Sequence, residues 1–213
     1  MKVNDNYLKE QLKHVYWLNG GCCAGKTTMT RKFVEELRFQ TLRDDVLKYR
    51  PFTSHLEYPA LQYPHPKLDW DKWFNRPNDE HCEWLFQIVK EMMEFFVIDL
   101  LKMPNDQPII IDLGIMPEEI LPFIPKERMV CLYTSDQEIE RLYYFREDHK
   151  MILDVINRTA NPEESIKNGN KNMVKFSHDI KEACIKHGIK TIERTPELSV
   201  DEQFKLVRGH FGI

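Results

Sequence analysis

Apolar residues recur along the chain in two patterns, as short uninterrupted runs and as longer stretches with helical spacing. The uninterrupted runs lie at residues 14–19, 109–111 and 128–133. Such runs are typical of strands that are buried on both faces, as in a parallel sheet. Shorter runs predict two more strands, at residues 45–49 and 189–192.

Between these runs, apolar residues return every three or four positions, which predicts helices that pack one face on the sheet. The longest stripe begins at residue 78 or 79 and continues to Leu100. Similar spacing predicts helices over residues 26–38, 136–157, 162–187 and 200–211. Because strands and helices alternate, we expect a three-layer α/β fold with about five parallel strands and helices on both faces.

Residues 50–78 follow neither pattern. They are rich in proline and aromatic residues and contain the stretch DWDKWFNRP. The segment is too apolar for a disordered linker and too often broken by proline for a continuous helix. Long ordered loops are usually functional, so we expect this segment to contribute to a site.

Composition limits the classes of protein that fit. The chain of 213 residues, 42% of them hydrophobic, can bury one core, so residues 1–213 are expected to form a single domain. Charges of both signs are interspersed and the net charge is −4, which favours small phosphates over nucleic acid as partners. The polar N-terminus and the lack of a long apolar run predict a cytoplasmic protein without membrane contact, and we expect it to be a monomer or homodimer. Five cysteines without C-x-x-C spacing are expected to be reduced thiols: Cys22, Cys23, Cys82, Cys131 and Cys184.

The segment GGCCAGKTT at residues 20–28 contains the phosphate-loop pattern G-x-x-x-x-G-K-[ST], directly after a predicted strand and before a predicted helix. Its glycines allow the tight turn that brings backbone N–H groups to phosphate oxygens. Lys26 adds a positive charge for the outer phosphates, and the Thr27 hydroxyl suits the Mg²⁺ that bridges them. We therefore expect ATP and Mg²⁺ to bind at Gly20, Gly21, Cys22, Cys23, Ala24, Gly25, Lys26, Thr27 and Thr28.

Asp112 stands at the end of a predicted buried strand, where ligands bind in open α/β sheets. A carboxylate there is suited to hold Mg²⁺, or its water shell, beside Thr27. The alternative is that Asp112 only caps the turn at residues 113–114.

Four arginines are candidates for contact with phosphate or substrate. Arg141 and Arg146 lie in the predicted helix over residues 136–157, where either one touches phosphate or both are solvated. Arg76 lies among aromatic residues and recognises a base or an acidic acceptor, or else covers the rings by cation–π contact. Arg50 is a candidate for an anionic acceptor.

The order of these parts resembles the nucleoside and nucleotide kinases of the P-loop class, which include adenylate, cytidylate and shikimate kinases. The stretches YWLNGGCCAGKTT, DWDKWFNRP and IIIDLGIMPEEI are also similar to a set of bacterial small kinases of uncertain substrate. The resemblance implies the sheet order 2-3-1-4-5, an acceptor region over about residues 50–93 and a lid over about residues 143–173. It further implies that Asp112 is the carboxylate after the third strand and that Arg141 and Arg146 are lid arginines.

Two positions depart from that family pattern. Many of these kinases carry an acidic residue after the second strand, whereas here the predicted strand leads to Arg50, and residues 171–172 are Lys and Asn where a lid arginine and aspartate are usual. Two hypotheses follow. The protein transfers the γ-phosphate of ATP to a nucleoside, nucleotide or similar metabolite, or it is an ATP-binding regulatory module with little or no kinase activity.

Overall fold

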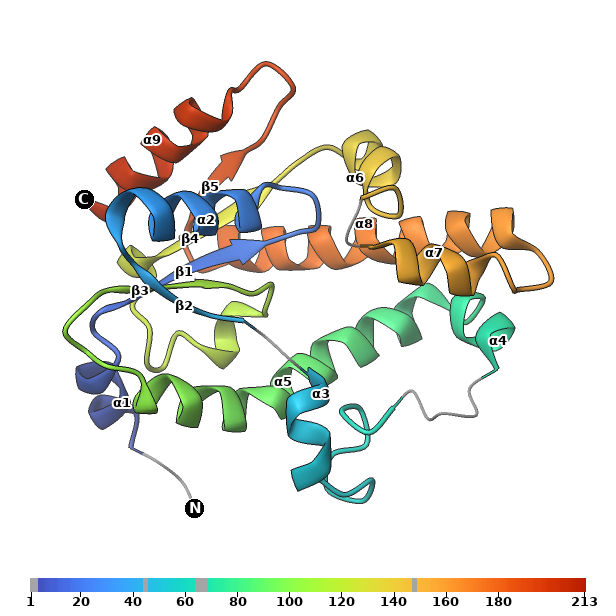
Figure 1. The fold of residues 1–213 in the computed structure, drawn as a ribbon, viewed down its shortest axis with the longest axis horizontal. Helices are drawn as coiled ribbons and strands as arrows, with labels where there is room; N and C mark the ends of the chain where they lie inside the picture. The colour runs from blue at the N-terminus through green and yellow to red at the C-terminus, as the bar shows by residue number, and fades with distance from the viewer. Residues whose placement is uncertain (1–3, 44–45, 64–68, 147–148) are drawn as a thin grey trace.

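Five parallel strands form one sheet in the order β2-β3-β1-β4-β5, which confirms the predicted sheet and its order (Figure 1). The computed structural model describes residues 4–43, 46–63, 69–146 and 149–213. The strands are β1 (Val15–Gly20), β2 (Gln40–Leu42), β3 (Ile109–Asp112), β4 (Met129–Tyr133) and β5 (Lys190–Glu193).

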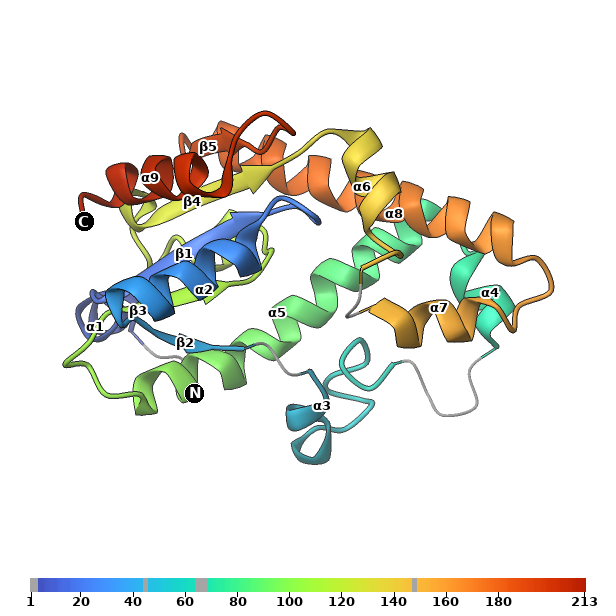
Figure 2. The same ribbon diagram turned by 45° about the horizontal axis from the view of Figure 1, so that its top comes forward.

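Helices cover both faces of the sheet (Figures 1 and 2). One face carries α2 and α9, and the other carries α5 and α8. The helices are α1 (Asp5–Gln11), α2 (Lys26–Leu37), α3 (Val46–Tyr49), α4 (Trp70–Phe74), α5 (Asn78–Lys102), α6 (Asp136–Leu142), α7 (Lys150–Ile156), α8 (Pro162–Lys186) and α9 (Val200–Phe211), with short 3₁₀ turns at Arg50–Phe52, Pro117–Glu119 and Lys126–Arg128.

Alternate residues of the central strands enter the two cores. Trp17 and Ile111 pack on the side of α5 and α8, whereas Leu18 and Ile110 pack on the side of α2 and α9. All four side chains are fully buried, as expected for strands that are apolar at every position. A third cluster, which includes Trp73 and Tyr144, joins α4 to the segment around α7 beyond the carboxyl ends of the strands.

The second strand lies earlier than the sequence predicts. Gln40–Leu42 forms β2, while Val46–Tyr49 is a short helix, so the predicted strand over residues 45–49 is wrong; Asp45 itself lies outside the described residues. The strand carries no apolar run, and its place is set by pairing with β3 and by the Gln40 N–H, which donates to the Pro108 carbonyl at 2.9 Å. The helix α3 instead packs on α5, where Tyr49 stacks on Phe95.

The predicted helix over residues 136–157 is also two helices rather than one. α6 ends at Leu142 and α7 begins at Lys150. Between them the Phe145 N–H donates to the Leu142 carbonyl and the His149 N–H donates to the Arg146 carbonyl, which are tight turns instead of helical bonds. Residues 147–148 lie outside the described part of the chain. The break places this segment across the carboxyl ends of the strands.

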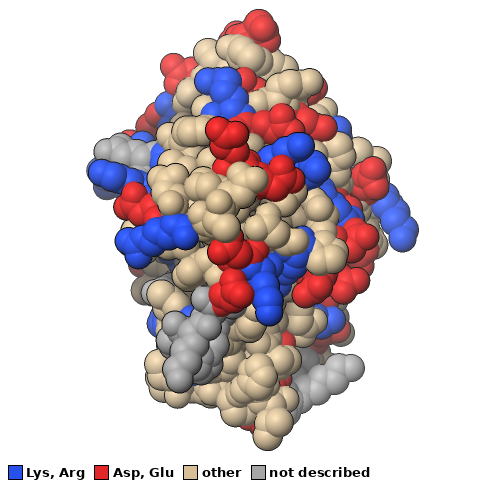
Figure 3. Space-filling view, turned by 90° about the vertical axis from the view of Figure 1, so that its right-hand side faces the viewer, with Lys and Arg blue, Asp and Glu red and all other residues tan. Residues whose placement is uncertain are grey.

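The helices and one face of the surface bear on the predictions for membrane contact and charge. Among the described residues, no helix is both long enough and apolar enough to cross a bilayer. Figure 3 shows lysine and arginine interspersed with aspartate and glutamate over one face of the molecule.

Substitution of Gly20, the last residue of β1, tests the packing at the carboxyl end of the central strand. A Cβ at this position would lie 1.9 Å from the Leu132 carbonyl oxygen, and its φ of +114° is unfavourable for other residues. We expect Gly20→Ala to lower the free energy of unfolding by about 3 kcal/mol or more. Gly209→Ala is the matched control, since nothing lies within 4 Å of its Cβ and alanine is the better helix former. Equal urea midpoints for the two variants would contradict the packing described.

Candidate functional site

The phosphate-loop motif forms the turn between β1 and α2, as the sequence predicts. Gly20 and Gly25 have φ values of +114° and +88°, and Cys23 has a φ of +59°. A left-handed conformation costs a non-glycine residue about 1 kcal/mol or more, so the surrounding structure has to hold Cys23 in place. The backbone conformation of the loop is thus unfavourable for the residue at position 23.

The N–H groups of the first half of the loop are bound by the protein. The Gly20 N–H donates to Asn19 Oδ1 at 2.8 Å, and the Gly21 N–H donates to the Leu132 carbonyl at 3.1 Å. The Cys22 N–H donates to Ser177 Oγ at 3.0 Å. Neither Gly20 nor Gly21 lines the cavity described below, so these two predicted binding residues shape the loop.

The second half of the loop opens on a cavity of about 490 Å³. Within the described part of the chain, α2 has no side-chain cap at Gly25, and no acidic residue stands in its first turn. The helix therefore presents uncapped N–H groups and the positive end of its dipole. Such a terminus favours an anion. Of the predicted binding residues, Cys22, Cys23, Ala24, Gly25, Lys26, Thr27, Thr28 and Asp112 line this cavity.

Thr27 and Asp112, the two predicted metal ligands, are in direct contact. Thr27 Oγ1 donates to Asp112 Oδ2 at 2.6 Å, although 85 residues separate them. Lys26 lies alongside, and its Nζ donates to the Gly21 carbonyl at 2.7 Å. A hydroxyl and a carboxylate oxygen are ligands that suit Mg²⁺.

Two side chains of β1 hold the segment that follows β3. Asn19 is fully buried; its Nδ2 donates to the Ile115 carbonyl and its Oδ1 accepts from the Ile115 N–H, both at 2.9 Å. The Trp17 indole N–H donates to the Leu113 carbonyl, also at 2.9 Å. These bonds fix the turn after Asp112 against the end of the central strand.

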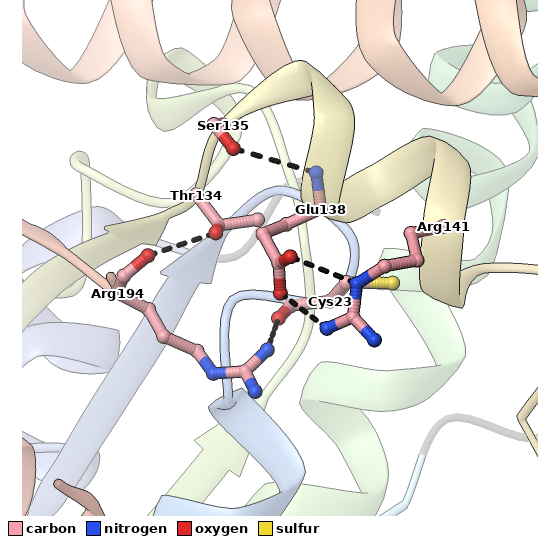
Figure 4. Close-up of polar contacts among 6 residues, drawn as sticks. All are labelled: Cys23, Thr134, Ser135, Glu138, Arg141 and Arg194. Atoms are coloured by element: carbon pink, nitrogen blue, oxygen red, sulfur yellow. Dashed lines mark hydrogen bonds and ion pairs between the residues drawn. The ribbon is translucent and has the colours of Figure 1, made fainter. Parts of the chain in front are cut away.

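The two predicted lid arginines have different surroundings. Arg146 lines the cavity together with Tyr143 and His149, and its Nη2 lies 2.7 Å from His149 Nε2. Arg141 is exposed, and its Nε and Nη2 donate to the two carboxylate oxygens of Glu138 at 2.9 and 2.8 Å (Figure 4). Of the two, Arg146 lines the phosphate-loop cavity and Arg141 does not.

The cavity is electropositive and its thiols are neutral. Lys26, Arg146 and Arg194 line it together with a single carboxylate among the described residues, that of Asp112. Burial raises the pKa of Cys22, and burial followed by the nearby Cys22 raises the pKa of Cys23 to about 11. The thiols therefore add no negative charge near neutral pH, which leaves the site suited to a polyphosphate.

Neither predicted substrate arginine lines this cavity. Arg50 lies in the 3₁₀ turn after α3, where its Nε donates to the Leu61 carbonyl at 2.8 Å and its Nη2 donates to the Tyr63 carbonyl at 3.2 Å. Arg76 lies over Trp73, with its guanidinium carbon 3.9 Å from the ring centroid. That is the cation–π arrangement weighed as the alternative for Arg76.

A second cavity, of about 710 Å³, runs along α5, the 59–63 loop and residues 115–119. Glu80, Glu83, Gln87 and Lys90 line it and are exposed, so it is open to solvent along α5. Among the described residues it shares no lining residue with the phosphate-loop cavity. The two cavities are lined by neighbouring residues of one segment, since Gly114 lines the phosphate-loop cavity and Ile115 lines this one.

Several residues of the site were not predicted from the sequence. Asn19 and Ser177 bind the first half of the loop, while Arg194 and Gln203 bind its second half from the C-terminal segment. Arg194 follows β5, so the rule that singles out Asp112 at a strand end would also have found it. The other three carry no local signal, because each lies inside an ordinary strand or helix.

Comparison with protein-family models and with curated proteins gives no match. Among solved structures, the chain is similar to a deoxyadenosine kinase from M. mycoides, described with the products dCMP and a flexible dCDP bound. The identity is 14% and the TM-score is 0.42, with 93% of this chain and 96% of that chain covered. Likeness at this level transfers neither a substrate nor the role of any residue, so function has to be argued from the site.

His81, which lies beside Arg76, makes the free energy of unfolding depend on pH. Burial, and then the adjacent Arg76, lowers the pKa of His81 from 6.5 to about 3, and Arg76 Nε donates to His81 Nδ1 at 3.0 Å. As the pH falls, His81 is therefore protonated in the unfolded chain before it is protonated in the folded protein. The free energy of unfolding is highest above pH 6.5 in this respect and decreases as the pH falls towards 3. We expect the free energy of unfolding, measured with urea, to fall between about pH 7 and about pH 4.5 in the wild type. In His81→Gln this fall should be smaller by about 1 to 3 kcal/mol. The exposed control His55→Gln should follow the wild type; parallel curves for all three proteins would contradict a buried neutral histidine.

Proposed function

We propose that the protein is an ATP-dependent phosphotransferase that moves the γ-phosphate of ATP to a small acceptor, a nucleoside, nucleotide or similarly sized metabolite. The observation that carries this proposal is the contact between Thr27 Oγ1 and Asp112 Oδ2, at 2.6 Å, beside Lys26 and the uncapped start of α2. This arrangement provides backbone donors, a point charge and hard oxygen ligands within one electropositive cavity. Those are the parts that phosphoryl transfer requires.

The residues present fit Mg²⁺ held largely by phosphate and water. The described residues contain no cluster of three or more His, Cys, Asp or Glu that would form a complete protein cage. Thr27 and Asp112 therefore supply a partial ligand set, as is usual for Mg²⁺ at phosphate sites. When bound, the ion neutralises phosphate charge, while Lys26 and the loop amides orient the outer phosphates.

Arg146 is the residue we propose to act from the lid, over about residues 143–173. It lines the same cavity as the phosphate loop, and we propose that its charge meets the outer phosphates of bound ATP. Arg141 is bound by Glu138 in this structure, so its participation requires that ion pair to open. Positive charge that approaches only in the transition state lowers the barrier more than charge that is always present.

The acceptor is proposed to bind within residues 50–93, with Arg50 and Arg76 as candidate contacts. Arg50 was noted in the sequence as replacing the acidic residue that usually follows the second strand. That interpretation was wrong, because β2 ends at Leu42 and is followed in the sequence by Arg43, Asp44 and Asp45. Asp44 and Asp45 lie outside the described residues, but the sequence does carry carboxylates after the strand.

The alternative function is an ATP-binding regulatory module without efficient chemistry. One of its two supports was the substitution at Arg50, which no longer marks the end of the second strand. The other was Asn172, which is fully buried in α8 and does not line the phosphate-loop cavity. Turnover with a panel of acceptors separates the two functions.

Purified protein with ATP, Mg²⁺ and a panel of nucleosides, nucleotides and hydroxylated metabolites should release ADP only when its acceptor is present. We expect Lys26→Ala to reduce that turnover by roughly 100-fold or more, because it removes a charge that stabilises the transferring phosphoryl group. Arg31→Ala is the matched control, since Arg31 is an exposed cation of the same helix. ATP binding without any acceptor-dependent turnover would favour the regulatory module.

Asp112→Asn tests the metal ligands separately from the chemistry. We expect this variant to need roughly tenfold more Mg²⁺ for ATP binding, because a hard charged ligand is replaced by a neutral one. Affinity for ATP without metal should not fall, since a negative charge has been removed. Calorimetric titrations at stepped Mg²⁺ concentrations measure both quantities, with the exposed Asp106→Asn as control. A Mg²⁺ dependence equal to the wild type would remove Asp112 from the proposed site.

A further inference from the structure

The C-terminal segment holds two consecutive carbonyl groups of the phosphate loop. Arg194, directly after β5, donates from Nη1 to the Cys23 carbonyl at 2.6 Å (Figure 4). Gln203, in α9, donates from Nε2 to the Ala24 carbonyl at 3.1 Å. The Gln203 side chain is buried, with 3% of its surface exposed, so its amide is fixed by packing.

These two bonds determine where the next N–H groups point. In a trans peptide the carbonyl oxygen and the following N–H lie in one plane and point in opposite directions. Holding the Cys23 carbonyl toward Arg194 therefore directs the Ala24 N–H away from it. Holding the Ala24 carbonyl toward Gln203 does the same for the Gly25 N–H. Ala24 and Gly25 line the cavity, so their amides lie at its wall, and we expect an anion in the cavity to meet them there.

The loop needs such external support at this point. Cys23 and Gly25 both have positive φ, which leaves the peptides between them without the bonds of a regular element. Gln203 also packs closely against Gly25, since its Oε1 would lie 2.8 Å from a Cβ built on that glycine. The same side chain thus holds one carbonyl and closes the space behind the next residue.

We infer that Gln203, supported by Arg194, is a positioning residue that orients the Ala24 and Gly25 amides toward phosphate; this inference rests on the proposed function of the site. Gln203 carries no charge, so it does not attract an anion electrostatically. Its effect on phosphate affinity then reports the orientation of the loop. Arg194 adds charge as well as position, so it is the weaker test.

The experiment compares Mg²⁺–ATP with inorganic tripolyphosphate, which has the phosphates without a base. Wild type, Gln203→Met and the exposed control Lys205→Ala are titrated calorimetrically with each ligand, well below their thermal midpoints. We expect Gln203→Met to weaken both ligands by the same factor, about three- to tenfold, as for one lost hydrogen bond. Lys205→Ala should bind both ligands as the wild type does.

Each other outcome counts against the inference in a different way. Weaker ATP binding with unchanged tripolyphosphate binding would make Gln203 a contact to the base and overturn the positioning role. Unchanged affinity for both ligands would overturn it too. A wild type that binds neither ligand would instead remove the proposed function. If Gln203→Met does not fold, Gln203→Asn keeps the amide but shortens its reach to the Ala24 carbonyl, and the same loss is expected.

Discussion

The side-chain amide of Asn19 joins the end of the central strand β1 to the segment that follows β3, and the geometry of the site depends on these hydrogen bonds. It makes both bonds to the Ile115 backbone and also accepts from the Gly20 N–H, in a position without solvent. A buried amide that lost these partners would cost about 1 to 3 kcal/mol. Parallel pairing of Leu18 with Asp112 sets the same two segments in register. Thr27 and Asp112 meet because both constraints agree.

The loop beyond that link divides into two halves with different tasks. Amides of the first half are bound to β4 and α8, through the Leu132 carbonyl and the Ser177 hydroxyl. Carbonyls of the second half are bound to the C-terminal segment, through Arg194 and Gln203. Consequently the donors that face the cavity come from the end of the loop and the start of α2. The neighbouring cations and neutral thiols make the same region favourable for an anion.

Local patterns predicted the elements that are defined by their own residues. The apolar run of β3, the helix at Lys26 and the stripe of α5 all lie within a few residues of their expected bounds. β2 was misplaced because its three residues carry no apolar run and are held by pairing. Asn19 and Gln203 were missed because their partners lie 96 and 179 residues away in sequence. Arg50 stays a candidate contact for the acceptor, and its bonds to the Leu61 and Tyr63 carbonyls could not be predicted because only the folded loop brings them near.

The central claim is that the second half of the loop, with Thr27 and Asp112, holds a polyphosphate and a divalent metal. A crystal structure with Mg²⁺ and a non-hydrolysable ATP analogue tests it most directly. The account predicts β- and γ-phosphates on the amides of the residues from Ala24 to Thr28, with the metal ion on Thr27 Oγ1 and facing Asp112. A nucleotide bound elsewhere, or phosphates held without those amides, would contradict it.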